Sequence, residues 1–401
     1  MRPRNERQKS SRGSRIRAYT WPVLITIGDL GRELPNAHPI DLGDNHPTRV
    51  GLVLVDAAVD SGTLTKARVQ PGFSHRGAEK LFEVRDYRQV LMLADRHDWQ
   101  TPAHGEIGLA ITAEHLMGLV ASPRATMLRT LLAEFSTAAC LLAHLSWVAH
   151  RANDERLTVD ILRARGTGRE LMLDWSGNRV HPMLTRLGGM AADVDDKWVS
   201  ALLGWVQAID HFLPALDAHI DSFPDGVGIL DAAMVEQLGL GGPVARAAGL
   251  GRDLRSQTSA LAYASLHTDS AHPEALNTTP VTSSGSAIAR LHQLVADLRT
   301  VSLLIRACAA ALPALDGPIA TQLAKIIKLP DAEAYLALEA PWGPAGFHIV
   351  SRAERTPWRV HLRTPSFANA QALEVALAGC PLEWVDLVVA SLGWTIGDLD
   401  K

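Results

Sequence analysis

Cysteine is scarce in this 401-residue chain, and its scarcity excludes several kinds of metal site. The three cysteines, Cys140, Cys308 and Cys380, are widely separated and form no Cys-x-x-Cys pair. Zinc and iron–sulfur sites held only by cysteine need four thiolates, so this chain does not supply one by itself. Such usage is typical of a reducing compartment. We expect each cysteine to be a small buried hydrophobic residue.

Long apolar runs are also missing. No stretch of eighteen or more apolar residues is free of charge, so no membrane span is expected. The first apolar run, residues 21–27, is too short for the hydrophobic region of a secretory signal and lacks a small-residue cleavage site. These absences predict a cytoplasmic protein whose contact with any membrane is made through partner proteins.

The net charge of −4 conceals an uneven distribution. Seven of the 39 basic residues but only one of the 43 acidic residues lie in the first 18 positions, which leaves the remaining chain near −10. A basic arm of this kind can bind nucleic acid or anionic lipid. No aromatic residue interleaves these arginines, as base stacking requires, so no nucleic-acid partner is expected. We interpret residues 1–35 as a disordered, solvated arm.

Hydrophobic periodicity predicts an α+β fold, in which a bundle of long helices is flanked by small β-sheets near both ends of the chain. Ser122-Pro123 is a helix-start signal, because serine caps and proline suits the first helical position. We expect strands at residues 51–55, 63–69, 334–339, 346–351 and 358–363, with a hairpin turn at residues 60–62. We expect long helices after residue 122 and at residues 194–219 and 286–311, a loop at residues 267–284, and two apolar helical segments after residue 363.

General catalytic motifs are absent. The sequence holds no G-x-G-x-x-G after a strand, no Walker A loop and no H-E-x-x-H. Gly239-Leu-Gly-Gly242 lacks the strand–turn–helix context of a phosphate cradle and is interpreted as a glycine-rich loop. His104-Gly-Glu106 offers two metal-ligating side chains without a third at a clear spacing, and a capped turn is the simpler interpretation.

One segment is far more specific. Residues 72–81 read Gly-Phe-Ser-His-Arg-Gly-Ala-Glu-Lys-Leu, and the pattern continues through Glu83, Arg85, Tyr87 and Gln89. Taken by themselves, the alternating charges at residues 75–80 predict ion pairs that hold a loop over a cavity. The plainer alternative is a surface salt-bridge network worth about 1 kcal/mol.

This segment resembles the signature of the D subunit of respiratory NADH:quinone oxidoreductase (complex I), a family related to nickel–iron hydrogenase large subunits that has lost its metal. The family signature reads Gly-Tyr-Leu-His-Arg-Gly-x-Glu-Lys, followed by x-Glu-x-Arg-x-Tyr-x-Gln. The resemblance spans about residues 36–401, which we expect to form one D-subunit-like domain. It also covers Asn45-His-Pro47, Arg186-Leu-Gly-Gly189, Gly226-Val-Gly-Ile229, Leu238–Gly242, the Arg246–Arg255 run, Arg363–Asn369 and the terminal Gly-Asp-Leu-Asp.

The resemblance implies a hydrogenase-large-subunit-like fold and a role as one subunit of an NADH:quinone oxidoreductase translocase. In the family, this subunit packs against an iron–sulfur subunit on the cytoplasmic side of the membrane, and the two enclose a quinone cavity. The faces around residues 75–77 and 397–401 are implied to point toward that partner and the cavity. The chain is expected to bind quinone but to hold no metal or iron–sulfur cluster of its own.

The same resemblance locates the quinone-cavity positions and shows where this chain departs from the family. They are His46, Val50, His75, Arg76, Trp99 and Asp154. The family's quinone histidine is Val50 here, and its quinone tyrosine is Trp99. The family's aspartate, which pairs with the histidine, is Asp154 if three residues are inserted after Glu134; the ungapped alignment gives Arg151. We favour Asp154.

These departures leave two functions open. The first is a working D-type subunit of the complex. The second is a non-catalytic structural or assembly paralogue, which docks in the complex without binding quinone. Valine offers no proton and tryptophan lacks an acidic hydroxyl, so the sequence predicts that quinone is not reduced by the family's proton-donating route unless His46 or His75 replaces the lost donors.

Overall fold

The computed structural model describes residues 24–27, 38–42, 46–48, 53–257, 260–269 and 283–401. Its longer helices are α2 (Tyr87–His97), α3 (Pro102–Met117), α4 (Pro123–Arg151), α5 (Glu155–Ser176), α6 (Asp196–Ile220), α10 (Ala287–Ala311) and α11 (Pro365–Ala376). Its shorter helices are α1 (Ala78–Glu83), α7 (Ala232–Gln237), α8 (Gly242–Ala247), α9 (Tyr263–Asp269), α12 (Val385–Leu392) and α13 (Ile396–Leu399). The expected basic segment, residues 1–18, lies outside the described residues.

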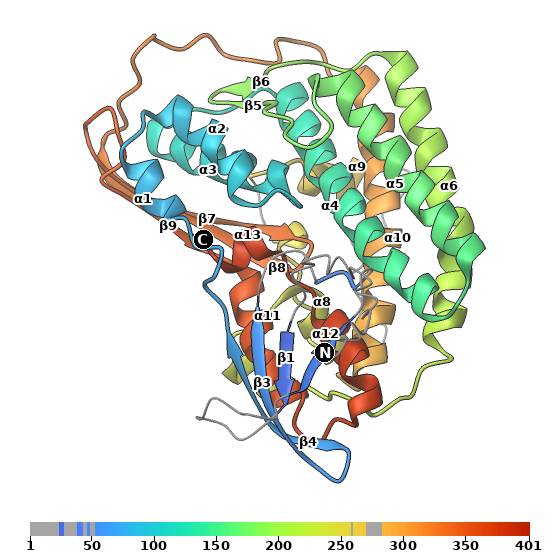
Figure 1. Cartoon of the computed structure of the whole chain (residues 1–401). Coiled ribbons are helices and arrows are strands. Elements are labelled where there is room, and N and C mark those ends of the chain that lie inside the picture. Colours follow the sequence, from blue (N-terminus) through green and yellow to red (C-terminus); the bar gives the residue numbers. More distant parts are fainter. Residues whose placement is uncertain (1–23, 28–37, 43–45, 49–52, 258–259, 270–282) are drawn as a thin grey trace, which may run out of the picture.

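Four long helices form the bundle. Figure 1 shows α4, α5, α6 and α10 side by side along one flank of the molecule. The predicted capping signal is present, because the Ser122 hydroxyl accepts the backbone N–H of Ala125 at the start of α4. Asp195 and Ser286 cap α6 and α10 in the same way. Aromatic rings fill the space between the helices, with Phe135 and Trp205 centroids 4.7 Å apart.

The N-terminal sheet has the order β2-β1-β3-β4 and lies at the opposite end of the molecule, beside α11 (Figure 1). It consists of β1 (Leu24–Ile27), β2 (His38–Asp41), β3 (Leu54–Asp60) and β4 (Thr63–Gln70). The predicted hairpin turn is confirmed, and both of its central residues, Ser61 and Gly62, have positive φ. β1 lies inside the range 1–35 that the sequence analysis interpreted as an arm, yet its backbone pairs with β2 and β3.

The C-terminal sheet is a meander of β7 (Asp331–Ala340), β8 (Gly343–Arg352) and β9 (Arg359–Arg363), and one of its faces is covered by α3. A two-stranded ribbon, β5 (Thr185–Arg186) and β6 (Gly189–Met190), lies near the start of α4. The α+β architecture predicted from the sequence is therefore confirmed. Two further boundaries differ from the prediction. The strand expected at residues 51–55 is β3, which begins at Leu54 and continues to Asp60. α9 continues to Asp269, inside the predicted loop 267–284, whose residues 270–282 lie outside the described chain.

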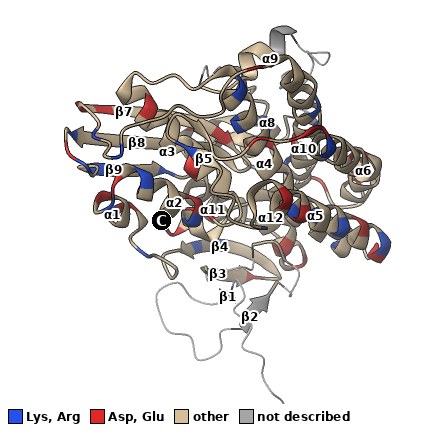
Figure 2. Ribbon diagram, turned by 90° about the horizontal axis from the view of Figure 1, so that it is seen from above, with Lys and Arg blue, Asp and Glu red and all other residues tan. Residues whose placement is uncertain are grey.

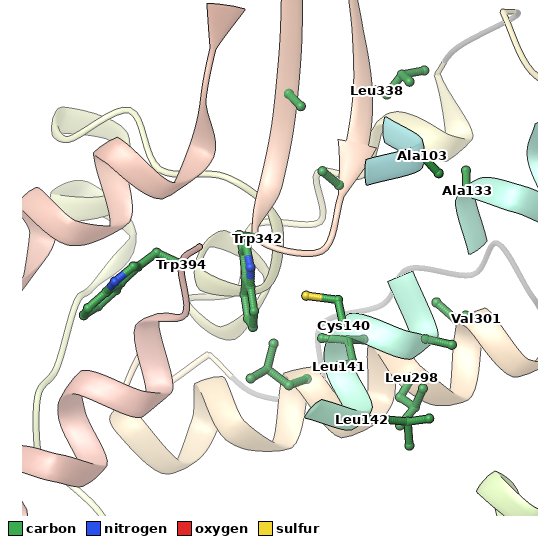
Figure 3. Close-up of a cluster of buried hydrophobic side chains, with 14 of the residues drawn as sticks. Ala103, Ala133, Cys140, Leu141, Leu142, Leu298, Val301, Leu338, Trp342 and Trp394 are labelled. Atoms are coloured by element: carbon green, nitrogen blue, oxygen red, sulfur yellow. The ribbon is translucent and has the colours of Figure 1, made fainter. Parts of the chain in front are cut away.

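The core is continuous from the bundle to the C-terminal sheet. Figure 3 shows Cys140 and Leu141 of α4 pointing toward Trp342, which belongs to the turn between β7 and β8. All three cysteines are buried free thiols, as predicted. Figure 2 shows acidic and basic residues interspersed along the helices, α5 included, rather than gathered in one patch.

Within the described residues, α4 and α6 are long and apolar enough to cross a bilayer by length and composition. In α4, 89% of the most apolar window is buried by the rest of the protein, whereas in α6 the share is 39%. The apolar side of α6, which includes Trp198, Trp205 and Phe212, is buried against α5 and α10. Packing inside this chain therefore accounts for α4 and for the apolar side of α6.

Candidate functional site

Trp99 lines a cavity of about 350 Å³ between α4, α5 and the segment that precedes β5. Its walls are mostly apolar and include Phe135 of α4, Met172 of α5 and Pro182. Three arginines, Arg165, Arg169 and Arg179, also line it. Ligand pockets typically occupy about 300–1,000 Å³ and combine apolar walls with a few polar groups, so this cavity has the size and lining of a small-molecule site.

Arg165 and Arg169 lie one turn apart on α5 and carry positive charge to the cavity. Among the described residues, neither guanidinium forms an ion pair or hydrogen bond, whereas Arg179 pairs with Glu170 at 3.1 Å. Burial, and then the neighbouring charge of Arg169, lower the pKa of Arg165. An anion bound in the cavity would offset both the burial of the Arg165 charge and its repulsion by Arg169. These arginines were not predicted as site residues, because their helical spacing alone does not distinguish a cavity wall from a solvated face.

Arg76 and Trp99, two of the positions predicted from the resemblance, are brought together. The Arg76 guanidinium carbon is 5.9 Å from the centroid of the Trp99 ring, within the range of a cation–π contact. Arg76 also donates to the carbonyl oxygen of Arg96 at 2.9 Å, which fixes it on the end of α2. His75 is exposed, and its backbone N–H donates to the Gly72 carbonyl in a turn.

The loop at residues 72–77 is held by the C-terminus. The Asp400 carboxylate accepts the backbone N–H groups of Gly72 and Ser74, at 2.7 and 2.8 Å. Glu79 binds Arg359 of β9 at 2.6 Å, so the charges of this segment do form the predicted ion pairs. The C-terminal end is not an exposed face, however. Residues 397–400 are buried in this chain, so the implied contact of residues 397–401 with a partner is restricted to Lys401.

His46 does not belong to the Trp99 cavity. Its Nε2 donates to the Asp386 carbonyl oxygen at 3.0 Å, and its Nδ1 accepts the Thr48 hydroxyl at 2.9 Å. Burial lowers the pKa of His46 to about 4, so the ring is neutral at physiological pH. The suggestion that His46 replaces a lost proton donor is therefore wrong, because both ring nitrogens are already engaged. Val50 lies outside the described residues.

Asp154 acts as a helix cap. Its carboxylate accepts the Leu157 N–H at 2.9 Å at the start of α5, and His219 donates to it at 3.0 Å. Arg151, the ungapped alternative, donates to the Asp386 carboxylate at 2.8 Å. Because His46 binds the carbonyl of that same residue, Arg151 lies in the neighbourhood of His46. The position with which the family's aspartate would pair is Val50, outside the described residues, so the choice of Asp154 over Arg151 stays a prediction.

A buried ionic network connects α8, α10 and β7 and was not predicted as such. The Arg246–Arg255 run, noted only for its resemblance, supplies three of its members. Arg246 binds Asp297 at 2.7 Å and Glu339 at 2.8 Å, while Arg255 binds Asp253 at 2.6 Å. Against the effect of burial, Arg255 and Arg246 lower the pKa of Asp253 to about 2. Arg255 also pairs with Glu134 of α4 at 3.4 Å. The sequence signal that could have indicated this network is the presence of the acidic residues Glu134 and Asp297 on otherwise apolar helix faces.

His104 and Glu106 lie on α3 inside the core rather than in a turn. Burial, and then Asp95, raise the pKa of Glu106 to about 8, so it is a neutral acid. Burial lowers the pKa of His104 to about 4. Within the part of the chain that the structure describes, no three His, Cys, Asp or Glu side chains are grouped as metal ligands.

Comparison with known proteins identifies relatives over nearly the whole chain. Residues 157–401 match the family described as respiratory-chain NADH dehydrogenase, 49 kDa subunit. The D 2 subunit of NADH-quinone oxidoreductase from Salinispora tropica is 35% identical over 389 residues, which cover 94% of this chain and 97% of the relative. The D 1 subunit of the same enzyme from Streptomyces coelicolor is 34% identical over 386 residues, with 94% and 98% covered.

A solved structure shares the fold. One chain of the membrane-bound sulfane sulfur reductase, an archaeal respiratory membrane complex, superimposes with a TM-score of 0.78 at 27% identity. The match covers 86% of this chain and 93% of that chain. The overall arrangement of helices and sheets is therefore that of a subunit in a respiratory membrane complex.

Proposed function

We propose, given that this chain belongs to the 49 kDa subunit family of respiratory-chain NADH dehydrogenase, that it is the D-type subunit of an NADH:quinone oxidoreductase and forms one wall of the quinone cavity. Membership confirms the resemblance first seen at residues 72–89. The observation that supports the quinone assignment is the cavity of about 350 Å³ beside Trp99, the position that corresponds to the family's quinone tyrosine.

The cavity suits a quinone in its reduced state. A quinone head group is a flat apolar ring with two oxygens, and the apolar side chains of Phe135 and Met172 offer it a surface. Electrons would come from the iron–sulfur cluster of a partner subunit and make the quinone oxygens anionic. Hydrogen bonds from charged groups are typically worth about 1.5–3 kcal/mol, so Arg165 and Arg169 would stabilise that anion without giving up a proton.

The partners follow from the same assignment. We propose that an iron–sulfur subunit covers the open side of the cavity near Arg76 and Trp99, and that further subunits of the complex connect this chain to the membrane. The chain itself would be peripheral, on the cytoplasmic side. The basic segment at residues 1–18 is then free to contact anionic lipid, the alternative raised by its charge.

A non-catalytic paralogue is the second candidate, and specific observations favour it. Trp99 has no hydroxyl to donate, and His46 is neutral with both nitrogens engaged. Such a chain would keep its docking surfaces and lose quinone chemistry. The two candidates therefore share every partner and differ only in whether the assembled complex reduces quinone.

The test is to purify the complex through this chain, identify its subunits and measure quinone reduction. Under the proposed function, Arg165→Gln lowers kcat/KM for quinone about ten- to a hundredfold, since 1.36 kcal/mol corresponds to tenfold. Arg163→Gln is the matched control, because Arg163 lies on the same helix but its side chain is 77% exposed. Co-purification without quinone reduction would favour the paralogue, and absence of an iron–sulfur partner would contradict both candidates.

A further inference from the structure

Two carboxyl groups from distant parts of the chain line one small cavity next to Trp99. Asp98 follows α2, and Asp398 belongs to α13; they are 5% and 7% exposed. Asp98 accepts the hydroxyls of Thr101 and Thr395, the second at 2.8 Å. Asp398 accepts the backbone N–H of Ser366 at 3.0 Å. The fold has therefore brought two acids together in the protein interior.

The cavity that both acids line has mostly apolar walls and the volume of one water. It measures about 20 Å³, and a single water needs roughly 10–15 Å³. His97, His104, Trp342 and Thr364 are among the residues that line it, and each has one buried polar atom that makes no hydrogen bond with another described residue: Nδ1 of both histidines, Trp342 Nε1 and Thr364 Oγ1. Unpartnered buried polar atoms on residues that line a cavity of this size are the usual partners of an internal water.

The charges around the pair do not balance two carboxylates. Within the described chain, neither acid forms an ion pair with Lys or Arg, and the one cationic candidate is His97, whose Nε2 is 3.7 Å from Asp398. The other titratable groups nearby are His104 of α3 and Cys140 of α4. Burial, and then the charge of Asp398, raise the pKa of Asp98. Two adjacent buried carboxyl groups cannot both ionise cheaply, so one of them retains a proton.

We propose that Asp98 and Asp398 hold one proton between them, carried by Asp98, and that with a water in the adjoining cavity they form a proton store for the Trp99 pocket. The role in turnover rests on the proposed function. Reduction of a quinone to quinol consumes two electrons, supplied by the partner's iron–sulfur cluster, and two protons. Asp98 supplies one of these protons, becomes a carboxylate and is reprotonated from bulk water through the cavity water. The second proton comes from bulk water. Val50 and Trp99 cannot provide this proton.

The shared proton is tested on the full chain by infrared spectroscopy in H₂O and D₂O. At pH 7, the difference between the infrared spectra of wild type and Asp98→Asn should show the C=O band of a protonated carboxyl group. This band should shift in D₂O. In Asp398→Asn the band should persist but titrate at lower pH than in wild type, because one cause of the raised pKa has been removed. Glu106→Gln is the matched control: it removes another buried neutral acid and should leave the Asp98 band unchanged.

An Asp98→Asn spectrum identical to wild type in the carboxyl region would overturn the shared proton. If Asp98→Asn fails to fold, the Asp398→Asn variant decides instead. A carboxyl band that titrates at lower pH than in wild type supports the shared proton, and a band that titrates at the same pH overturns it.

The role in turnover is tested in the assembled complex. Asp98→Asn should lower kcat at least about tenfold at low pH and leave KM unchanged. In wild type, kcat should fall with rising pH, and in Asp98→Asn this fall should be abolished. An active wild-type assembly with the same pH profile in Asp98→Asn would overturn the store, whereas an inactive wild-type assembly overturns the proposed function.

Discussion

Gly397 lies against the carbonyl oxygen of His97, so that the C-terminal segment is packed directly on the end of α2. A Cβ at Gly397 would lie 2.3 Å from that oxygen and 3.1 Å from the Cα of Asp98. Both atoms belong to the backbone and cannot rotate away. This contact holds Asp398 beside Asp98 and keeps the C-terminus from being an exposed docking surface.

Gly397→Ala should therefore lower the free energy of unfolding by about 1–3 kcal/mol, the usual cost of overpacking. The matched control is Gly204→Ala in α6, where no atom lies within 4 Å of the added Cβ. That substitution should raise the free energy of unfolding by about 0.5–1 kcal/mol, because alanine favours a helix interior. Urea denaturation of both variants measures the difference, and equal effects would contradict the close contact.

Restoring the family's donors should increase quinone reduction by the assembled complex. In Val50→His with Trp99→Tyr, an imidazole and a phenol return to the two quinone positions, and a positioned proton donor contributes typically about 10²–10⁴-fold. We expect a gain in kcat of at least about tenfold. Trp358→Tyr, at an exposed position, controls for the loss of an indole. If wild type already turns over as fast as the double variant, the departures at these positions do not limit the reaction.

Arg246 should be essential for stability because it neutralises buried carboxylates. Arg246→Met leaves Asp297 and Glu339 without their cation, and breaking a buried ion pair in this way costs about 3–5 kcal/mol. Arg299→Met removes an ion pair with Asp217 in which Arg299 is 48% exposed, and should cost less than about 1 kcal/mol. Chemical denaturation of the two variants at pH 7 provides the comparison. A loss below about 1 kcal/mol for Arg246→Met would mean that the network relaxes without it.

Mild acid should destabilise the fold through histidines that are buried in their neutral form. Burial lowers the pKa values of His46, His104 and His144 to about 4, from 6.5 in the unfolded chain. Between these values the unfolded state binds more protons, so stability falls as the pH falls. Each histidine contributes up to about 1.4 kcal/mol per pH unit. The contribution of these histidines to the free energy of unfolding should therefore fall between pH 6.5 and 4, while Glu106, with its raised pKa, contributes with the opposite sign. Relative to wild type, the free energy of unfolding of His144→Gln should fall less steeply, or rise more steeply, as the pH falls through this range.

Local patterns determined the elements of this fold. Ser122, Ser286 and the turn at Ser61-Gly62 mark boundaries that the structure reproduces, because caps and turns depend on side chains only a few residues apart. The signature at residues 72–89 also identified the family, since a long run of fixed residues is specific without any knowledge of packing. The sequence thus determined the fold class, the family, three of the four bundle helices and most of the strands, whereas α2, α3 and α5 were not predicted.

Only the tertiary structure decided which of the marked residues act together. His46 and Trp99 were predicted in one cavity, yet His46 packs on Asp386 while Trp99 lines a pocket with Arg165. Asp98 and Asp398 are 300 positions apart in the sequence and lie beside one cavity in the structure. Burial and long-range contacts also set the charge state of each acid and histidine. No local pattern encodes them, because they depend on which distant segments exclude water from a site.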